Sequence, residues 1–190
     1  MILTHGSNSL VVGGGGNQIK IGDIWYPYIQ LGNLLWLGTA LKNPTSDPTL
    51  YKTKEGIDGL YYKTKAFMDH DTWDTTAEFL SWMPSGWRVP TESDYNNLIS
   101  NVTNYTQLLV ESEGGTNELD FNAQLGGFYT GYGNEMARFG TRFMYAAAGS
   151  LGGFEGGTDV SGTKGIRFYG NWGGDFWESP RQLRLCCNAT

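Results

Sequence analysis

Charged and reactive side chains are scarce in this chain of 190 residues. Asp, Glu, Lys and Arg together make up 17% of it, and it has two histidines and two cysteines. An enzyme would need a cleft of titrating groups with perturbed pKa values, and the sequence shows no such set, so we expect no enzymatic activity. The net charge of −6 argues against nucleic acid or an anionic membrane surface as a partner.

Long apolar runs are also missing. No stretch is long and apolar enough to span a bilayer, and residues 1–7 lack the basic and apolar regions of a signal peptide. We therefore expect a protein without membrane insertion that stays or assembles in the cytoplasm. A mature form whose signal has been removed is the alternative.

Glycine and aromatic residues are abundant, with 28 glycines and 14% aromatics. This composition is typical of one loop-rich, β-containing domain, which we place at residues 18–190. Residues 1–17 have apolar positions without a helical period and end in a run of four glycines. They are predicted to form a flexible N-terminal attachment segment, and a frayed terminus is the alternative.

Two turn dipeptides, Gly22-Asp23 and Gly32-Asn33, separate runs of mainly apolar residues between positions 19 and 37. This spacing is typical of β-hairpins and predicts an antiparallel meander. The polar, turn-rich residues 41–60 are predicted to form a loop, and residues 76–82 a short helix. Later in the chain, seven glycines between Gly149 and Gly165 predict an extended loop.

Residues 83–95 (MPSGWRVPTESDY) join a turn, a short extended segment and a helix start. Thr91 is placed to cap a helix over about residues 92–103, with Asp94 at its third position as in a capping box. The apolar residues of that helix recur at helical spacing and form one face: Tyr95, Leu98, Ile99 and Val102.

The motif at 83–95 resembles the core of the Fibrobacter succinogenes major paralogous domain. That family has a C-type-lectin-like fold and occurs in surface proteins of Bacteroidetes and in virion proteins of their phages. Further similar segments occur on both sides of this motif, in the family's order: residues 22–26, 29–36, 59–62, 117–123, 126–129 and 183–187. The resemblance implies an α+β, C-type-lectin-like fold of antiparallel strands with one or two helices and long glycine-rich loops.

The resemblance also implies a disulfide between an early and a late cysteine. Met83 stands at the early position here, so Cys186 and Cys187 have lost that partner. We expect two free buried thiols, with a strained vicinal disulfide as the alternative. Loss of the bridge fits folding in a reducing compartment. Adjacent residues of a strand point to opposite faces, which argues against joint metal binding by the two cysteines.

Metal ligands are few. Asp69-His70-Asp71 offers oxygen and nitrogen atoms, but no fourth ligand accompanies it, and a solvated loop is the favoured interpretation. The Glu-Pro-Asn and Gln-Pro-Asp tripeptides of calcium-dependent lectins are absent. We therefore predict no metal and no cofactor.

Aromatic residues and arginine are concentrated in the C-terminal third, and such residues dominate binding hot spots. The residues predicted to bind a ligand are Tyr129, Tyr132, Arg138, Tyr169, Asn171, Trp172, Asp175, Phe176 and Trp177. The alternative for the two tryptophans is a place in the core or in a subunit interface.

The resemblance implies a non-enzymatic structural and recognition protein of a phage virion, a head fibre or a tail-associated fibre. Such a protein would attach to other virion proteins through residues 1–17, form a homotrimer and bind a glycan or protein of the host surface. It would be assembled in the cytoplasm of its bacterial host. The alternative is a surface-attached or secreted bacterial adhesin that binds glycan or protein.

Overall fold

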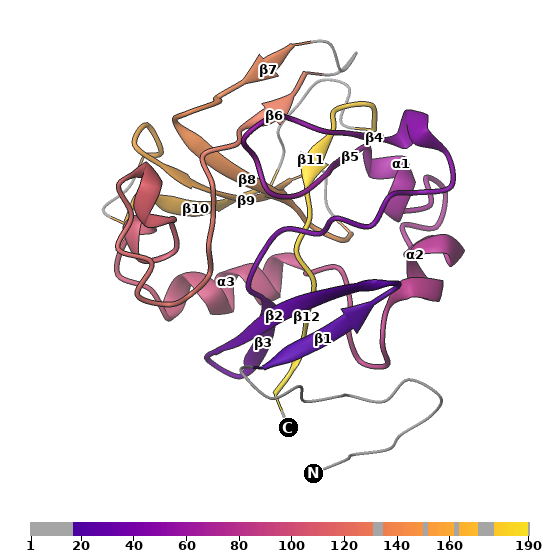
Figure 1. Ribbon diagram of the computed structural model, residues 1–190, viewed down its shortest axis with the longest axis horizontal. Helices are drawn as coiled ribbons and strands as arrows, with labels where there is room; N and C mark the ends of the chain where they lie inside the picture. The colour runs from indigo at the N-terminus through magenta and orange to yellow at the C-terminus, as the bar shows by residue number, and fades with distance from the viewer. Residues whose placement is uncertain (1–16, 131–134, 150–151, 162–163, 171–176, 190) are drawn as a thin grey trace.

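The computed structural model describes residues 17–130, 135–149, 152–161, 164–170 and 177–189. In these ranges the chain forms an α+β fold of short strands in curled, mostly antiparallel sheets (Figure 1). This confirms the predicted α+β class. The described part holds three α-helices, one more than expected. Of the predicted attachment segment, only Asn17 is described.

A four-stranded antiparallel sheet, ordered β1-β2-β3-β12, contains both the first and the last strand. Its strands are β1 (Gln18–Ile21), β2 (Ile24–Leu31), β3 (Leu34–Leu37) and β12 (Cys186–Asn188). The two predicted turns join the first three strands. Gly22 and Gly32 have φ angles of +55° and +62°, which glycine adopts without strain. The predicted meander is confirmed.

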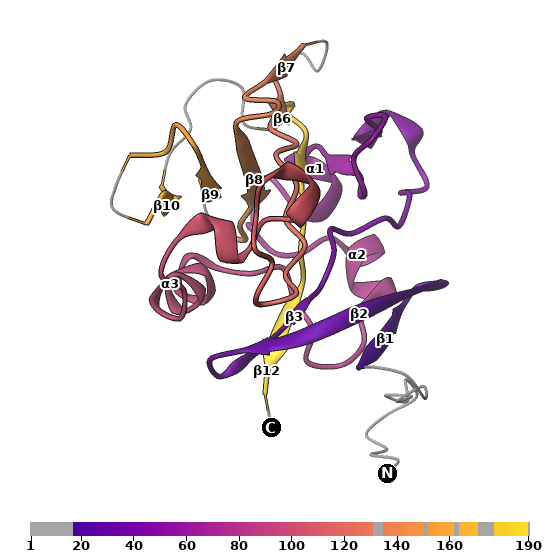
Figure 2. The ribbon, with the colours of Figure 1, turned by 60° about the vertical axis from the view of Figure 1, so that its left-hand side comes forward.

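A six-stranded sheet has the order β10-β9-β8-β11-β5-β4, in which only β8 and β11 are parallel. Its strands are β4 (Tyr51–Lys52), β5 (Tyr61–Tyr62), β8 (Arg142–Ala146), β9 (Gly153–Gly157), β10 (Ile166–Tyr169) and β11 (Arg181–Gln182). Strands β6 (Phe128–Tyr129) and β7 (Met136–Ala137) form a separate hairpin. Figures 1 and 2 show this hairpin at the end of the molecule opposite the four-stranded sheet.

The helices are short. They are α1 (Thr64–Phe67), α2 (Ala77–Trp82) and α3 (Glu92–Ser100), with 3₁₀ turns η1 (Pro48–Leu50), η2 (Tyr105–Gln107) and η3 (Glu111–Glu113). Helix α2 agrees with the prediction for residues 76–82. The region 41–60, predicted as a loop, also contains η1 and the edge strand β4.

The cap of α3 forms as predicted. The Thr91 hydroxyl accepts a hydrogen bond from the Asp94 N–H (3.3 Å), and the Asp94 carboxylate accepts one from the Thr91 N–H (2.9 Å). The helix ends at Ser100 rather than at residue 103. Asn101 leaves helical geometry, and its side-chain amide donates to the Asn97 carbonyl (2.8 Å), which satisfies the last turn.

Two hydrophobic clusters make up the core of the described residues, and successive residues of β12 enter different clusters. Cys186 lies with Trp36 in one, and Cys187 lies with Met83 in the other. Both thiols are free and buried, as predicted. Burial raises the pKa of both, that of Cys187 to about 11, so they stay protonated at neutral pH.

The prediction of one extended loop over 149–165 was wrong, because β9 lies inside this range. The strand is buried along its whole length and pairs with β8 and β10 on its two sides. A Cβ atom at Gly156 would lie 2.3 Å from Cζ of Phe143, so glycine serves close packing here rather than a turn.

No described helix has both the length and the apolar character needed to cross a membrane.

Candidate functional site

The outer face of β8, β9 and β10 carries polar side chains, while the inner face carries apolar ones. On β8, Phe143 and Tyr145 belong to the core cluster that includes residues of α3 and β3. Arg142 and Met144 alternate with them and lie on the opposite face. Met144 is opposite Glu155 of β9, and Glu155 is opposite Arg167 of β10. The three strands therefore bring residues far apart in the sequence into one row.

A cleft of about 270 Å³ lies on this outer face. Its lining consists of Phe128, Arg138, Arg142, Met144, Glu155, Arg167 and Tyr169. The lining thus combines three of the chain's six arginines with two aromatic rings.

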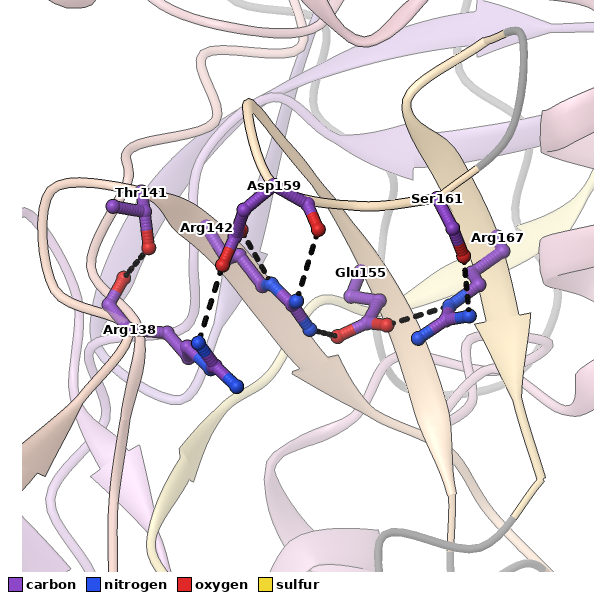
Figure 3. Close-up of polar contacts among 7 residues, drawn as sticks. All are labelled: Arg138, Thr141, Arg142, Glu155, Asp159, Ser161 and Arg167. Atoms are coloured by element: carbon purple, nitrogen blue, oxygen red, sulfur yellow. Dashed lines mark hydrogen bonds and ion pairs between the residues drawn. The ribbon is translucent and has the colours of Figure 1, made fainter.

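Glu155 is at the centre of the polar network (Figure 3). Its side chain is only 1% exposed, and each carboxylate oxygen accepts from a different arginine. Oε2 lies 2.9 Å from Nη1 of Arg142, and Oε1 lies 2.7 Å from Nε of Arg167. Two guanidinium groups therefore compensate the one buried carboxylate.

Asp159 holds the same network from the loop after β9. Its carboxylate accepts from Nε of Arg142 (2.6 Å) and from Nη1 of Arg138 (3.3 Å), and its carbonyl oxygen accepts from Nη2 of Arg142 (3.1 Å). The hydrogen bond between Arg142 and Asp159 lowers the pKa of the Asp159 carboxyl and raises that of the guanidinium. All three nitrogens of Arg142 are therefore engaged within the protein.

Arg138 is positioned by a tight turn. Its φ of +61° is unusual for a residue with a side chain. Its carbonyl oxygen accepts from the N–H groups of Thr141 (3.1 Å) and Arg142 (3.0 Å) and from the Thr141 hydroxyl (3.0 Å). This turn fixes the backbone from which the Arg138 side chain extends beside the cleft.

Arg167 borders the cleft on β10. Its Nη1 donates to Oγ of Ser161 (2.9 Å), and its guanidinium lies 4.8 Å from the ring centre of Tyr169. Counting this residue, Arg138 and Arg142 against Glu155 and Asp159 leaves a local charge of +1 in a chain whose net charge is −6. Guanidinium donors and aromatic rings of this kind suit the binding of a polar ligand.

Comparisons of the chain with protein-family models, curated proteins and solved structures find no match.

Of the residues predicted to bind a ligand, the structure brings Arg138 and Tyr169 together in the cleft. Tyr129 does not line it. Its hydroxyl donates to the Thr53 carbonyl (2.8 Å), and its ring packs edge-on against Tyr61 at 5.2 Å. Five predicted residues lie outside the described ranges: Tyr132, Asn171, Trp172, Asp175 and Phe176.

Trp177 belongs to a different aromatic cluster. Its ring centre lies 4.8 Å from that of His70 and 5.2 Å from that of Trp73. The neighbouring Asp69 carboxylate accepts from the N–H groups of residues 71 and 72 and thus closes a turn. In the described part of the chain, no three His, Cys, Asp or Glu residues gather as a metal site would require.

Arg142, Glu155 and Arg167 were missed from the sequence. Arg142–Ala146 reads RFMYA and Ile166–Tyr169 reads IRFY, and such runs rich in aromatic residues are typical of strands. That signal could have placed both arginines in strands, but their common face follows only from the strand register. Glu155 had no such signal, because its strand reads GFEGG and resembles a loop.

Proposed function

We propose that this chain is a non-enzymatic structural and recognition protein of a phage virion, a head fibre or a tail-associated fibre. Its residues 18–190 would form a C-type-lectin-like domain. The resemblance of residues 83–95 to the Fibrobacter succinogenes major paralogous domain supports this proposal. The turn, the extended segment and the capped helix of that motif occur in the expected order.

One observation carries the recognition role: the cleft opens on the side of the six-stranded sheet that faces away from the attachment end. The inner face of β8–β10 packs on α3 and, through the same core cluster, on β3. The first and last strands, β1 and β12, lie together in the four-stranded sheet (Figures 1 and 2). A protein held at that end would present the cleft to its surroundings.

The proposed partners follow from this arrangement. Residues 1–17 would attach the chain to other virion proteins, and the cleft would contact a glycan or protein of the host surface. A homotrimer would bury exposed apolar side chains such as Trp25 and Leu80, which lie outside the cleft.

Light scattering of the full chain, beside a variant that begins at Asn17, tests the assembly. We expect each form to have three times the mass of its own chain, which is 21.0 kDa for the full chain, because residues 1–16 serve attachment rather than trimer formation. A monomer in both forms would contradict the fibre and favour the surface-attached or secreted adhesin.

Binding of the fluorescently labelled full chain to a panel of Bacteroidetes strains tests recognition. We expect strain-specific binding that the variant beginning at Asn17 retains. If no strain in the panel binds the chain, and no phage particle carries it by immunogold labelling, the proposed function is wrong.

A further inference from the structure

We propose that the cleft binds a sugar residue carrying an oxyanion, a carboxylate or a sulfate, held between Arg138 and Arg167. This inference rests on the proposed function, because it names the ligand class of the same recognition site.

Arg142 and Glu155, at the centre of the network, have a structural role, and the flanking Arg138 and Arg167 can contact a ligand. Arg142 and Glu155 have side chains 13% and 1% exposed, and they bond directly to one another. The remaining two nitrogens of Arg142, Nε and Nη2, donate hydrogen bonds to Asp159. Since these donors and acceptors are paired within the protein, this pair fixes the floor of the cleft.

The two flanking arginines are different. The side chains of Arg138 and Arg167 are 54% and 36% exposed. Within the described residues, Arg138 bonds only through Nη1, and Arg167 bonds through Nε and Nη1. Each therefore retains Nη2 as a donor, and Figure 3 shows the two side chains on either side of Arg142 and Glu155. Guanidinium groups bind planar or tetrahedral oxyanions through two parallel donors.

The charge of the site favours an anion. Glu155 and Asp159 each receive hydrogen bonds from two arginines, so neither carboxylate is left uncompensated to repel an anionic ligand. The remaining charge of +1 lies on a chain with a net charge of −6. An anion is thus attracted to this cleft and repelled by the chain as a whole.

The size and walls of the cleft favour a single sugar ring. Its volume of about 270 Å³ lies below the range of roughly 300–1,000 Å³ that is typical of drug-sized ligands. The rings of Phe128 and Tyr169 form its apolar walls, and that of Tyr169 is exposed. Aromatic faces stack on pyranose rings, while the two guanidinium groups select the charged substituent.

Isothermal titration calorimetry of the full chain with methyl glucuronide, a sulfated methyl galactoside and neutral methyl glucoside tests the inference. We expect one or both anionic sugars to bind, and the neutral sugar to bind at least about tenfold more weakly, because it offers nothing to the arginines. Which anionic sugar binds distinguishes a carboxylate from a sulfate. Binding should weaken at high salt.

Arg138→Gln and Arg167→Gln should each weaken binding of the anionic sugar by about tenfold or more. Lys20→Gln is the matched control, since it removes the same charge from a surface hairpin outside the cleft and should leave the affinity unchanged. Arg138→Gln is the more informative of these two variants, because a half-exposed side chain can be replaced without unfolding the protein. Arg167→Lys, which keeps the charge and loses the fork, should bind with intermediate affinity.

Three results would overturn the ligand assignment: no binding of either anionic sugar, equal binding of the neutral one, or unchanged affinity in Arg138→Gln. Binding to cells separates this inference from the proposed function. Cell binding that Arg138→Gln abolishes, but that neither anionic sugar competes, would refute the sugar and leave the recognition role standing. Binding of an anionic sugar without any binding to cells would support the site and count against the role.

Discussion

The guanidinium of Arg184 and those of the cleft arginines differ in their burial and in their hydrogen-bond partners. Arg184 is fully buried, and Nη1 donates to the Leu37 carbonyl (2.8 Å). Its Nη2 donates to the Asn122 carbonyl and to the Tyr145 hydroxyl, both at 3.1 Å. The guanidinium also lies 3.8 Å from the ring centre of Phe121. This arginine joins β3, β8 and the segment around residue 122.

The cleft arginines pair with carboxylates instead, and their exposure rises from Arg142 to Arg167 and Arg138. Arg88, which pairs with Asp94 outside the cleft, is also partly exposed. A buried guanidinium that satisfies backbone carbonyls contributes to stability, whereas an exposed one keeps donors for a ligand. We therefore expect stability to depend on the arginines in order of burial and ligand affinity to depend on the exposed ones.

Arg184→Met should cause the largest loss of stability, about 3 kcal/mol, because three acceptors lose its donors, and two of them belong to the buried residues Leu37 and Tyr145. Urea unfolding followed by tryptophan fluorescence measures the loss. Arg184→Lys, which keeps the charge but not the fork, should recover less than half of it. A loss below about 1 kcal/mol for Arg184→Met would show that the buried guanidinium contributes little to stability.

Arg142→Met should cost about 2 kcal/mol, because it leaves the buried carboxylate of Glu155 with Arg167 alone. A double-mutant cycle with Glu155→Gln isolates the pair, and we expect a coupling of at least about 1 kcal/mol. Additive single effects would show that the pair does not act as a scaffold.

Asp94→Asn should cost about 1–2 kcal/mol at neutral pH, through the cap of α3 and the pair with Arg88. Burial opposes ionisation of Asp94, but hydrogen bonds from Arg88 and Thr91 outweigh it and hold the carboxyl pKa below its usual value. The folded pKa is thus below the unfolded one, so this contribution is present at neutral pH and is lost as the pH falls through the folded pKa.

Urea unfolding of wild type and Asp94→Asn across the acid range tests this pH dependence. The difference between the two proteins should shrink toward zero in acid, while Lys20→Gln serves as a control without such a trend. A difference that grows as the pH falls would contradict the assignment.

Arg138→Gln should have the smallest effect on stability, within about 0.5 kcal/mol, because its pair with Asp159 is largely exposed. The same variant should lose affinity for the anionic sugar. A loss of stability above about 1 kcal/mol would show that Arg138 stabilises the fold. It would contradict the assignment of stability to the buried arginines and of ligand binding to the exposed ones.

Parts of this fold were predictable because their determinants are local. Gly22 and Gly32 mark tight turns between apolar runs, and Thr91 and Asp94 cap α3 across three residues. The cleft was predictable only through Arg138 and Tyr169. Its centre depends on the register of β8, β9 and β10, which no local pattern in the glycine-rich segment indicated.

The meander, the helix cap, the two unbridged thiols and the scarcity of reactive groups can all be predicted from the sequence alone. The turns and the helix cap depend on interactions within a few residues. The unbridged thiols and the scarcity of reactive groups follow from the composition of the chain. Which arginines are buried and which border the cleft becomes clear only in the folded protein. The three acceptors of Arg184 lie 147, 62 and 39 residues away in the sequence, so folding alone brings them together. Strand register is fixed by side-chain packing between distant segments, and local residue preferences do not specify that packing.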